Sequence, residues 1–261
     1  MAKVAAVVYG FVVYVVFLGT FLYAIAFIGN FLVPKTIDSG AGAFSIPSLV
    51  IDAVLLGLFA IQHSVMARQG FKRVWTKLVP RPVERSTYVL FASLCLLLLY
   101  WQWRPMTNIV WSVQNSTGKL VLEALFAIGW LMVLVSTYLV SHTDLFGLRQ
   151  VTLFASGKPY THIGFKAPVL YKQVRHPIYL GFLIAFWCAP TMTIGHLVFS
   201  IATTGYILLA IQFEERDLVT FFGDAYKQYR QRVPMLVPFT KRRAAGAQDA
   251  SAETVGSARA R

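Results

Sequence analysis

Two polar clusters flank one apolar stretch near the C-terminal end of the sequence. Arg175, His176 and Pro177 stand side by side directly before it, and Glu214 and Glu215 follow it. Proline is favoured in the first turn of a helix, where its missing N–H would have no partner, so the sequence predicts that a helix begins at Pro177. The free backbone donors of that first turn, and the positive end of the helix dipole, favour an anion such as a carboxylate beside Arg175 and His176.

The apolar stretch itself predicts a membrane hairpin. Residues 178–190 and 195–213 are apolar, and the turn sequence PTMTIG lies between them. At about 1.5 Å per residue the first piece is short for a complete crossing, so we expect a helix-turn-helix. This hairpin returns Glu214 and Glu215 to the level of Arg175, and one pocket would then hold receptors for an anion and for a cation.

Adenosylmethionine presents the combination of groups that such a pocket suits. It carries a carboxylate, an amino group, a sulfonium cation and an adenine, and aromatic walls for the adenine are available in Tyr179, Phe182 and Tyr226. The alternative is that Arg175 and the two glutamates are ordinary interfacial charges at helix ends.

Composition places these clusters in a membrane protein. Of the 261 residues, 57% are hydrophobic and only 13% are charged, which is far too apolar for a soluble domain of this length. Residues 4–33 carry no charge and are too long for a cleaved signal peptide. With further apolar runs at 48–66, 87–103 and 120–140, the sequence predicts an all-α integral membrane protein with five to six membrane helices, formed by residues 1–240 as a single domain.

The net charge of +13 sets the expected orientation. Lysine and arginine concentrate at 67–86, at 141–177 and after residue 213, so the positive-inside rule places these segments and both termini in the cytoplasm and the loops with Lys35 and Arg104 outside. Basic residues confined to loops between apolar runs are not a nucleic-acid surface, and no nucleic-acid partner is expected. Membrane lipid is the expected surrounding partner.

The remaining segments complete the expected architecture. Hydrophobic residues at helical spacing predict a cytoplasmic amphipathic helix over 214–233, and residues 241–261 predict a disordered tail. The two cysteines, Cys95 and Cys188, lie in separate apolar runs, and no metal-ligand spacing is found.

The ordered combination of RHPIYLG, an apolar hairpin, EERDL and FGDAYKQYRQRVPMLVP, over residues 171–238, resembles the membrane methyltransferases that include isoprenylcysteine carboxyl and phospholipid methyltransferases. Upstream, QHSVMARQGFKRVW and VERSTYVL are similar to the nurim-like branch. Together they make most of residues 1–240 resemble the bacterial methanethiol S-methyltransferases, which implies a bacterial inner-membrane location.

This resemblance implies an adenosylmethionine site and assigns residues to it. Glu214 or Glu215 would hold the amino group, and the Arg175 and His176 end would hold the carboxylate. The full set implied for the cofactor site comprises Tyr171, Arg175, His176, Pro177, Tyr179, Gly181, Glu214 and Glu215.

Methyl transfer to a thiol also needs a group that favours the thiolate, because a free cysteine thiol has a pKa near 8.5 and a simple alkyl thiol is a weaker acid. His63 is the first candidate, near the cytoplasmic end of the second span, and Asp52 lies about 16 Å away along the same helix face, too far to bond to it. Glu84 and Arg85 are further catalytic candidates on the same side of the membrane. The alternatives are a His63 bonded to a neighbouring loop and a helix N-cap at Ser86.

Three functions follow from these patterns. The leading hypothesis is methylation of methanethiol to dimethyl sulfide with adenosylmethionine, at a membrane-embedded site that faces the cytoplasm and takes a small volatile thiol. The second is a methyltransferase of a larger lipid-like acceptor, such as a prenyl thiol or a lipid amine. The third is a nurim-like membrane protein without catalysis.

Overall fold

The computed structural model describes residues 1–238 and residue 240. Five of its helices are long and apolar enough to cross a membrane: α1 (Ala2–Gly29), α2 (Ile46–Ala67), α4 (Arg81–Gln102), α5 (Ser116–Val140) and α9 (Ile194–Phe222). This confirms the predicted class of all-α integral membrane protein. The predicted tail over 241–261 lies outside the described residues.

Side-chain caps fix where several of these helices begin. Ser45 accepts the backbone N–H of Ser48 before α2, Asn115 accepts that of Gly118 before α5, and Thr193 accepts that of His196 before α9. Each cap satisfies a backbone donor that the first helical turn leaves without a partner. At the other end of α1, Asn30 takes the left-handed conformation, with φ 59°, which stops the helix.

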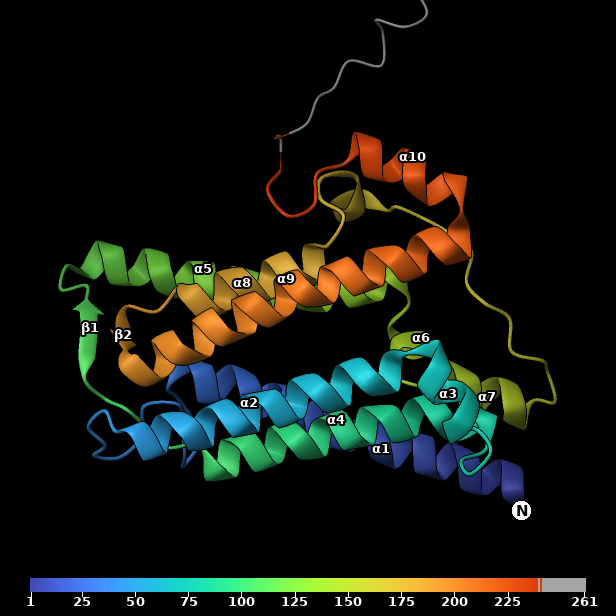
Figure 1. Ribbon diagram of the computed structural model, residues 1–261, viewed down its shortest axis with the longest axis horizontal. Helices are drawn as coiled ribbons and strands as arrows, with labels where there is room; N and C mark the ends of the chain where they lie inside the picture. Colours follow the sequence, from blue (N-terminus) through green and yellow to red (C-terminus); the bar gives the residue numbers. More distant parts are fainter. Residues whose placement is uncertain (239, 241–261) are drawn as a thin grey trace, which may run out of the picture.

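The long helices form two layers that run along the same axis (Figure 1). One layer contains α1, α2 and α4, and the other contains α5, α9 and the short helix α8 (Pro177–Trp187). Aromatic side chains such as Phe27, Trp103 and Trp130 fill the main buried cluster, which includes residues of both layers. Short helices gather at the right-hand end in Figure 1, namely α3 (Gln69–Trp75), α6 (His142–Leu145), α7 (Leu148–Ala155) and α10 (Asp224–Arg232), and a 3₁₀ turn, η1, covers Val169–Lys172.

The predicted hairpin is present, and its turn includes a strand that the sequence did not predict. Helix α8 has 11 residues, or about 16 Å at 1.5 Å per residue, and α9 returns beside it. Between them, β2 (Thr191–Thr193) pairs antiparallel with β1 (Ile109–Ser112) of the loop after α4. Thr193 also donates its hydroxyl to Asp38 at 2.5 Å. The turn of the hairpin is thereby bonded to the loop after α4, through β1, and to the loop after α1, through Asp38.

Helix α8 lies unusually close to α5 at a pair of glycines. A Cβ built on Gly129 would lie 2.7 Å from the backbone oxygen of Gly181 and 2.7 Å from the backbone nitrogen of Ala185. Small residues at helix contacts are the usual means by which membrane helices gain close packing. The observed contact of Gly181 is therefore with α5.

Two local expectations were wrong. The amphipathic segment 214–233 is not one helix: α9 continues to Phe222, and Gly223, with φ 59° and ψ −131°, separates it from α10, a conformation open mainly to glycine. The alternative of an N-cap at Ser86 also fails, because α4 begins at Arg81 after Pro80 and Ser86 is fully buried inside it.

The glycine contact gives a stability prediction. Gly129→Ala should lower the free energy of unfolding by about 1–3 kcal/mol, because the added methyl group must displace backbone rather than a flexible side chain. The measurement is the thermal midpoint of the detergent-solubilised protein. Gly205→Ala is the matched control, since a Cβ there meets nothing within 4 Å, and its midpoint should stay unchanged or rise. Equal midpoints for both variants would contradict this account of the contact.

Candidate functional site

Glu215 is the centre of the cluster that the hairpin brings together. Arg175 Nε donates to Glu215 Oε1 at 2.7 Å, and His176 Nε2 lies 3.1 Å from the same oxygen. The side chains of Arg175 and Glu215 are only 8% and 11% exposed. A buried carboxylate of this kind is tolerated because the charged Arg175 donates to it and the His176 ring provides a further polar contact.

Arg175 also fastens the start of α8 to the chain after α10. Its Nη1 donates to the backbone oxygens of Val233, at 2.5 Å, and Arg230, at 3.1 Å. The backbone N–H groups at positions 175 and 176 donate to Pro234 and Met235. Much of the donor capacity of this arginine is thus used within the protein.

Glu214 stands beside this cluster and is more accessible. Its side chain is 44% exposed, and its Oε2 lies 4.0 Å from His176 Nδ1. The ring of Tyr179 of α8 lies 5.7 Å from the ring of His176. Of the two adjacent glutamates, Glu215 is paired with Arg175 inside the protein, and Glu214 is the more accessible.

Tyr171 is held at the edge of the cluster through its backbone. Its carbonyl oxygen accepts the hydroxyl of Tyr229 of α10 at 2.5 Å. Burial raises the pKa of the Tyr229 hydroxyl to about 12, so this donor keeps its proton near neutral pH. The contact anchors η1 onto α10.

A second cluster joins α2 and α4 in the other layer. The Tyr88 hydroxyl lies 2.9 Å from His63 Nε2 and 3.0 Å from His63 Nδ1. The His63 ring stacks on Phe59, and the Arg85 guanidinium lies 4.8 Å from the centre of the Tyr88 ring. Arg85 Nε also donates to the backbone oxygen of Leu145 at 2.7 Å. His63 and Arg85 therefore share one tyrosine.

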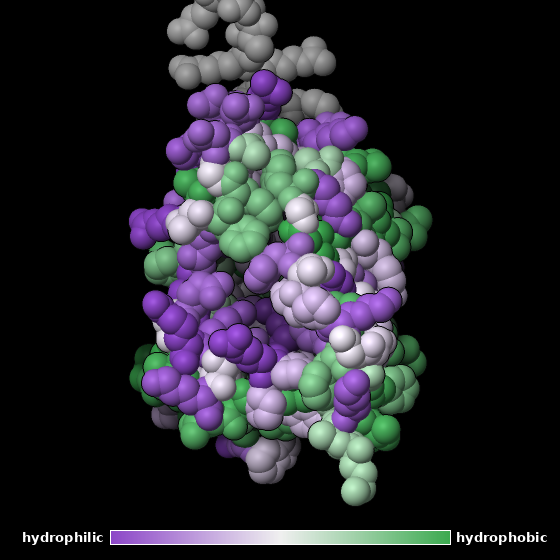
Figure 2. Space-filling view, turned by 90° about the vertical axis from the view of Figure 1, so that its right-hand side faces the viewer, coloured by the Kyte–Doolittle hydropathy of each residue, from purple (hydrophilic) through white to green (hydrophobic). Residues whose placement is uncertain are grey.

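One tyrosine connects the two layers. The Tyr206 hydroxyl of α9, the helix that carries Glu214 and Glu215, lies 3.2 Å from Ser64 Oγ of α2, next to His63. Figure 2 looks onto the end of the molecule at which the short helices gather and shows hydrophilic surface across its middle, hollowed near the centre. The helices that carry the two clusters therefore meet between the layers.

Glu84 and Asp52 have other surroundings. Glu84 lies 4.0 Å from Lys72 Nζ of α3, and burial lowers the pKa of that lysine. Asp52 is fully buried and accepts the backbone N–H of Arg104 at 2.8 Å, at the far end of the bundle. Asp52 therefore ties α2 to the chain after α4.

Sequence reasoning missed Tyr88 and Tyr206, because tyrosines are common in membrane spans and at their ends. A signal was present for Tyr88, since it lies three residues after Arg85 and hence on the same helix face. Tyr206 offers no such signal, because its partner Ser64 lies 142 residues earlier.

Fold and site define the class: an all-α multi-pass membrane protein with a charged cluster where the start of α8 meets α9 and a histidine–tyrosine cluster where α2 meets α4. Sequence comparison then gives the family. The methanethiol S-methyltransferase of Mycobacterium tuberculosis (strain ATCC 25618 / H37Rv) is 56% identical over 242 residues, which cover 93% of this chain and 99% of the relative. That of Crocosphaera subtropica (strain ATCC 51142 / BH68) is 52% identical over 92% of this chain and 94% of the relative.

The chain belongs to the methanethiol S-methyltransferase family. Nurim of Mus musculus is a more distant relative, 30% identical over 66% of this chain and 68% of its own length, in keeping with the nurim-like branch. No family model matches the sequence. No solved structure matches it either.

The unequal surroundings of neighbouring acidic residues predict unequal stability effects. Glu215→Ala should lower the free energy of unfolding by about 3–5 kcal/mol, because it leaves Arg175 buried without its counter-charge. Asp217→Ala removes an acid whose side chain is 57% exposed and which pairs with Arg68 at 2.9 Å, and should cost only about 0–1 kcal/mol. Thermal midpoints in detergent measure both, and a Glu215→Ala protein as stable as Asp217→Ala would contradict the structural role of the buried pair.

Proposed function

We propose that this protein methylates methanethiol to dimethyl sulfide with adenosylmethionine as methyl donor. The observation that carries the proposal is the contact between the two helices that hold the clusters: Tyr206 of α9, which carries Glu215, meets Ser64 of α2, which adjoins His63 of the His63–Tyr88 pair. The names of the similar proteins support methanethiol as the acceptor. Orientation follows the basic loops, which favour a bacterial inner membrane with this region and both chain ends on the cytoplasmic side.

The residues of the charged cluster fit adenosylmethionine. Glu214, with its 44% exposed side chain, offers a carboxylate to the amino group, while Glu215 orders Arg175 and His176. The first turn of α8, which begins at Pro177, offers backbone donors to the carboxylate. Tyr179 offers an aromatic face. When bound, adenosylmethionine supplies an electrophilic methyl group on a sulfonium.

We assign to His63 the deprotonation of the thiol. The S–H proton would pass to an imidazole nitrogen of His63, and the resulting thiolate would take the methyl group that bound adenosylmethionine supplies, leaving the donor sulfur as a neutral thioether. The negative charge of the thiolate and the positive charge of the sulfonium would both be lost in the transfer, so a site shielded from water favours it. The apolar lengths of α2 and α4 around His63 provide that shielding.

Tyr88 is a positioning residue in this scheme. Its hydroxyl lies within hydrogen-bond distance of His63, and its ring is held under the Arg85 guanidinium. Arg85 in turn is fixed by the Leu145 carbonyl, and its positive charge favours a nearby thiolate. Glu84, beside Lys72, stays a catalytic candidate at this end of α4. Tyr171 and Gly181 stay candidates for the adenosylmethionine site.

The direct test is activity. Membranes that contain the protein, supplied with adenosylmethionine and methanethiol, should release dimethyl sulfide into the headspace, measured by gas chromatography. Glu214→Ala should lose binding of adenosylmethionine, measured by calorimetry, while its thermal midpoint changes little because the side chain is half exposed.

The outcomes separate the three candidate functions. Adenosylmethionine binding without dimethyl sulfide, together with methylation of a prenyl thiol or a lipid amine, would replace methanethiol by a larger acceptor. Absence of adenosylmethionine binding in the folded protein would overturn the enzyme assignment and favour a nurim-like role without catalysis. Unchanged binding in Glu214→Ala would remove Glu214 from the proposed site.

The roles of His63 and Tyr88 predict a graded loss of activity. His63→Ala should lower kcat by about 10²–10⁴-fold, the usual contribution of a positioned proton acceptor. Tyr88→Phe should lower kcat by roughly 5-fold, the loss expected for one hydrogen bond of about 1 kcal/mol. Steady-state rates with methanethiol at saturating adenosylmethionine measure both.

A more acidic thiol distinguishes a His63 that accepts the thiol proton from a His63 that only supports the structure. With trifluoroethanethiol, which ionises more readily, the defect of His63→Ala should shrink, because less help is needed to form the thiolate. Tyr88→Phe should also displace the pH dependence of kcat. A His63→Ala defect of equal size with both thiols would show that His63 acts through structure alone.

A further inference from the structure

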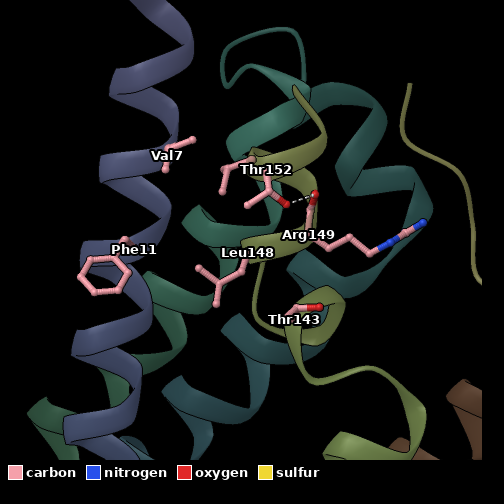
Figure 3. A pocket seen from close by; sticks show the side chains of 7 residues that line it. Val7, Phe11, Thr143, Leu148, Arg149 and Thr152 are labelled. Atoms are coloured by element: carbon pink, nitrogen blue, oxygen red, sulfur yellow. Dashed lines mark hydrogen bonds between the residues drawn. The ribbon is translucent and has the colours of Figure 1, made fainter. Parts of the chain in front are cut away.

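An apolar groove lies between α1 and α7, apart from the proposed active site. Its volume is about 300 Å³, at the lower end of the usual range for ligand pockets of about 300–1,000 Å³. Figure 3 shows Val7 and Phe11 of α1 on one side and Leu148 and Thr152 of α7 on the other. The lining is completed by Thr143, Arg149 and Val151. None of these residues belongs to the proposed catalytic or cofactor site.

The floor of the groove is a close contact between the two helices. Val151 is fully buried, and a Cβ built on Gly10 would lie 2.8 Å from its Cγ2. Glycine at position 10 therefore lets α7 lie directly against α1, and the larger side chains on either side form the walls. The contact fixes the shape of the groove.

The groove continues into the surface that α1 presents to lipid. Val8 is 56% exposed, Phe11 is 60% exposed and Val12 is 53% exposed. In a helix of membrane-spanning length these side chains meet acyl chains, so Phe11 belongs both to the groove and to the lipid-facing surface. An apolar recess of this kind holds water poorly and suits a hydrocarbon chain.

Basic side chains stand at one end of the groove. Lys3, Val7 and Phe11 follow one another at intervals of four residues and so share one face of α1. Lys3 Nζ lies 3.5 Å from the position of a Cβ on Gly157, and the exposed Lys158 comes next in the chain. In the described part of the chain, neither lysine forms an ion pair.

Arg149, which also lines the groove, is already paired within the protein. Its Nη1 pairs with Asp144 at 3.0 Å and donates to the backbone oxygen of Thr161 at 2.8 Å. The charge of this arginine is thus satisfied within the protein, which leaves Lys3, near Gly157, and the exposed Lys158 that follows Gly157 as the cations beyond the end of α7.

We infer that the groove between α1 and α7 binds one anionic phospholipid of the surrounding bilayer. One acyl chain lies between Val7 and Leu148, and the phosphate lies at Lys3 and Lys158. Basic residues at a membrane surface attract anionic headgroups, and the apolar lining supplies the remaining affinity. The inference is independent of the proposed reaction.

The test uses the delipidated full-length protein in detergent. Dioleoyl phosphatidylglycerol is titrated against dioleoyl phosphatidylcholine, and bound lipid is counted by native mass spectrometry. One tightly held phosphatidylglycerol per chain is expected, and Lys3→Gln with Lys158→Gln should weaken its binding by roughly thirtyfold, as expected for two surface cations. The matched control is Arg73→Gln with Lys77→Gln, which removes the same charge from exposed positions on α3 and the residues that follow it.

A second pair of variants tests the acyl-chain part. Val7→Phe fills the groove and should weaken both lipids, whereas Val8→Phe, on a neighbouring exposed position, should weaken neither. Equal affinity for the two lipids, or equal loss in the two double variants, would overturn the assigned headgroup site. If Val7→Phe still bound phosphatidylglycerol as tightly, the acyl chain of the lipid could not lie in this groove.

Discussion

The hydrogen-bonded pair between Glu215 and Arg175 is the interaction on which the organisation of the site depends. A buried carboxylate needs hydrogen-bond donors to offset the loss of water, and Glu215 meets Arg175 and His176, the two residues before Pro177. Arg175 also donates through Nη1 to the carbonyl groups of 230 and 233. The arginine thus links the start of α8 both to α9 and to the chain at the end of α10.

The hairpin can meet this requirement only because both of its ends are fixed. Helix α8 has only 11 residues, and it is held against α5 by the close backbone contact at Gly129 and Gly181. At the opposite end, the pairing of β2 with β1 completes the turn with backbone hydrogen bonds. Arg175 and Glu215 lie on either side of this attached hairpin, Arg175 directly before α8 and Glu215 within α9.

The features that could be predicted from the sequence are those marked by charged residues beside apolar runs. The membrane class, the long helices and the juxtaposition of Arg175, His176 and Glu215 could all be predicted, because ionisable residues are costly beside apolar membrane runs and are retained there mainly for function. The strands β1 and β2 have four and three residues, too few for a periodic pattern. Tyr88 and Tyr206 were hidden because a tyrosine in a membrane span is ordinarily a packing residue, and their partners are distant in sequence.

The division of charge between the two clusters bears directly on the proposed chemistry. In the cluster proposed for the cofactor, Glu215 pairs with the charged Arg175 at 2.7 Å. On the acceptor side, His63 is bonded to a phenol, which can donate to or accept from either imidazole nitrogen. A phenol adds no negative charge beside the ring, whereas a carboxylate partner would favour a permanently charged imidazolium. The tyrosine thus suits a base that must begin each cycle without a proton.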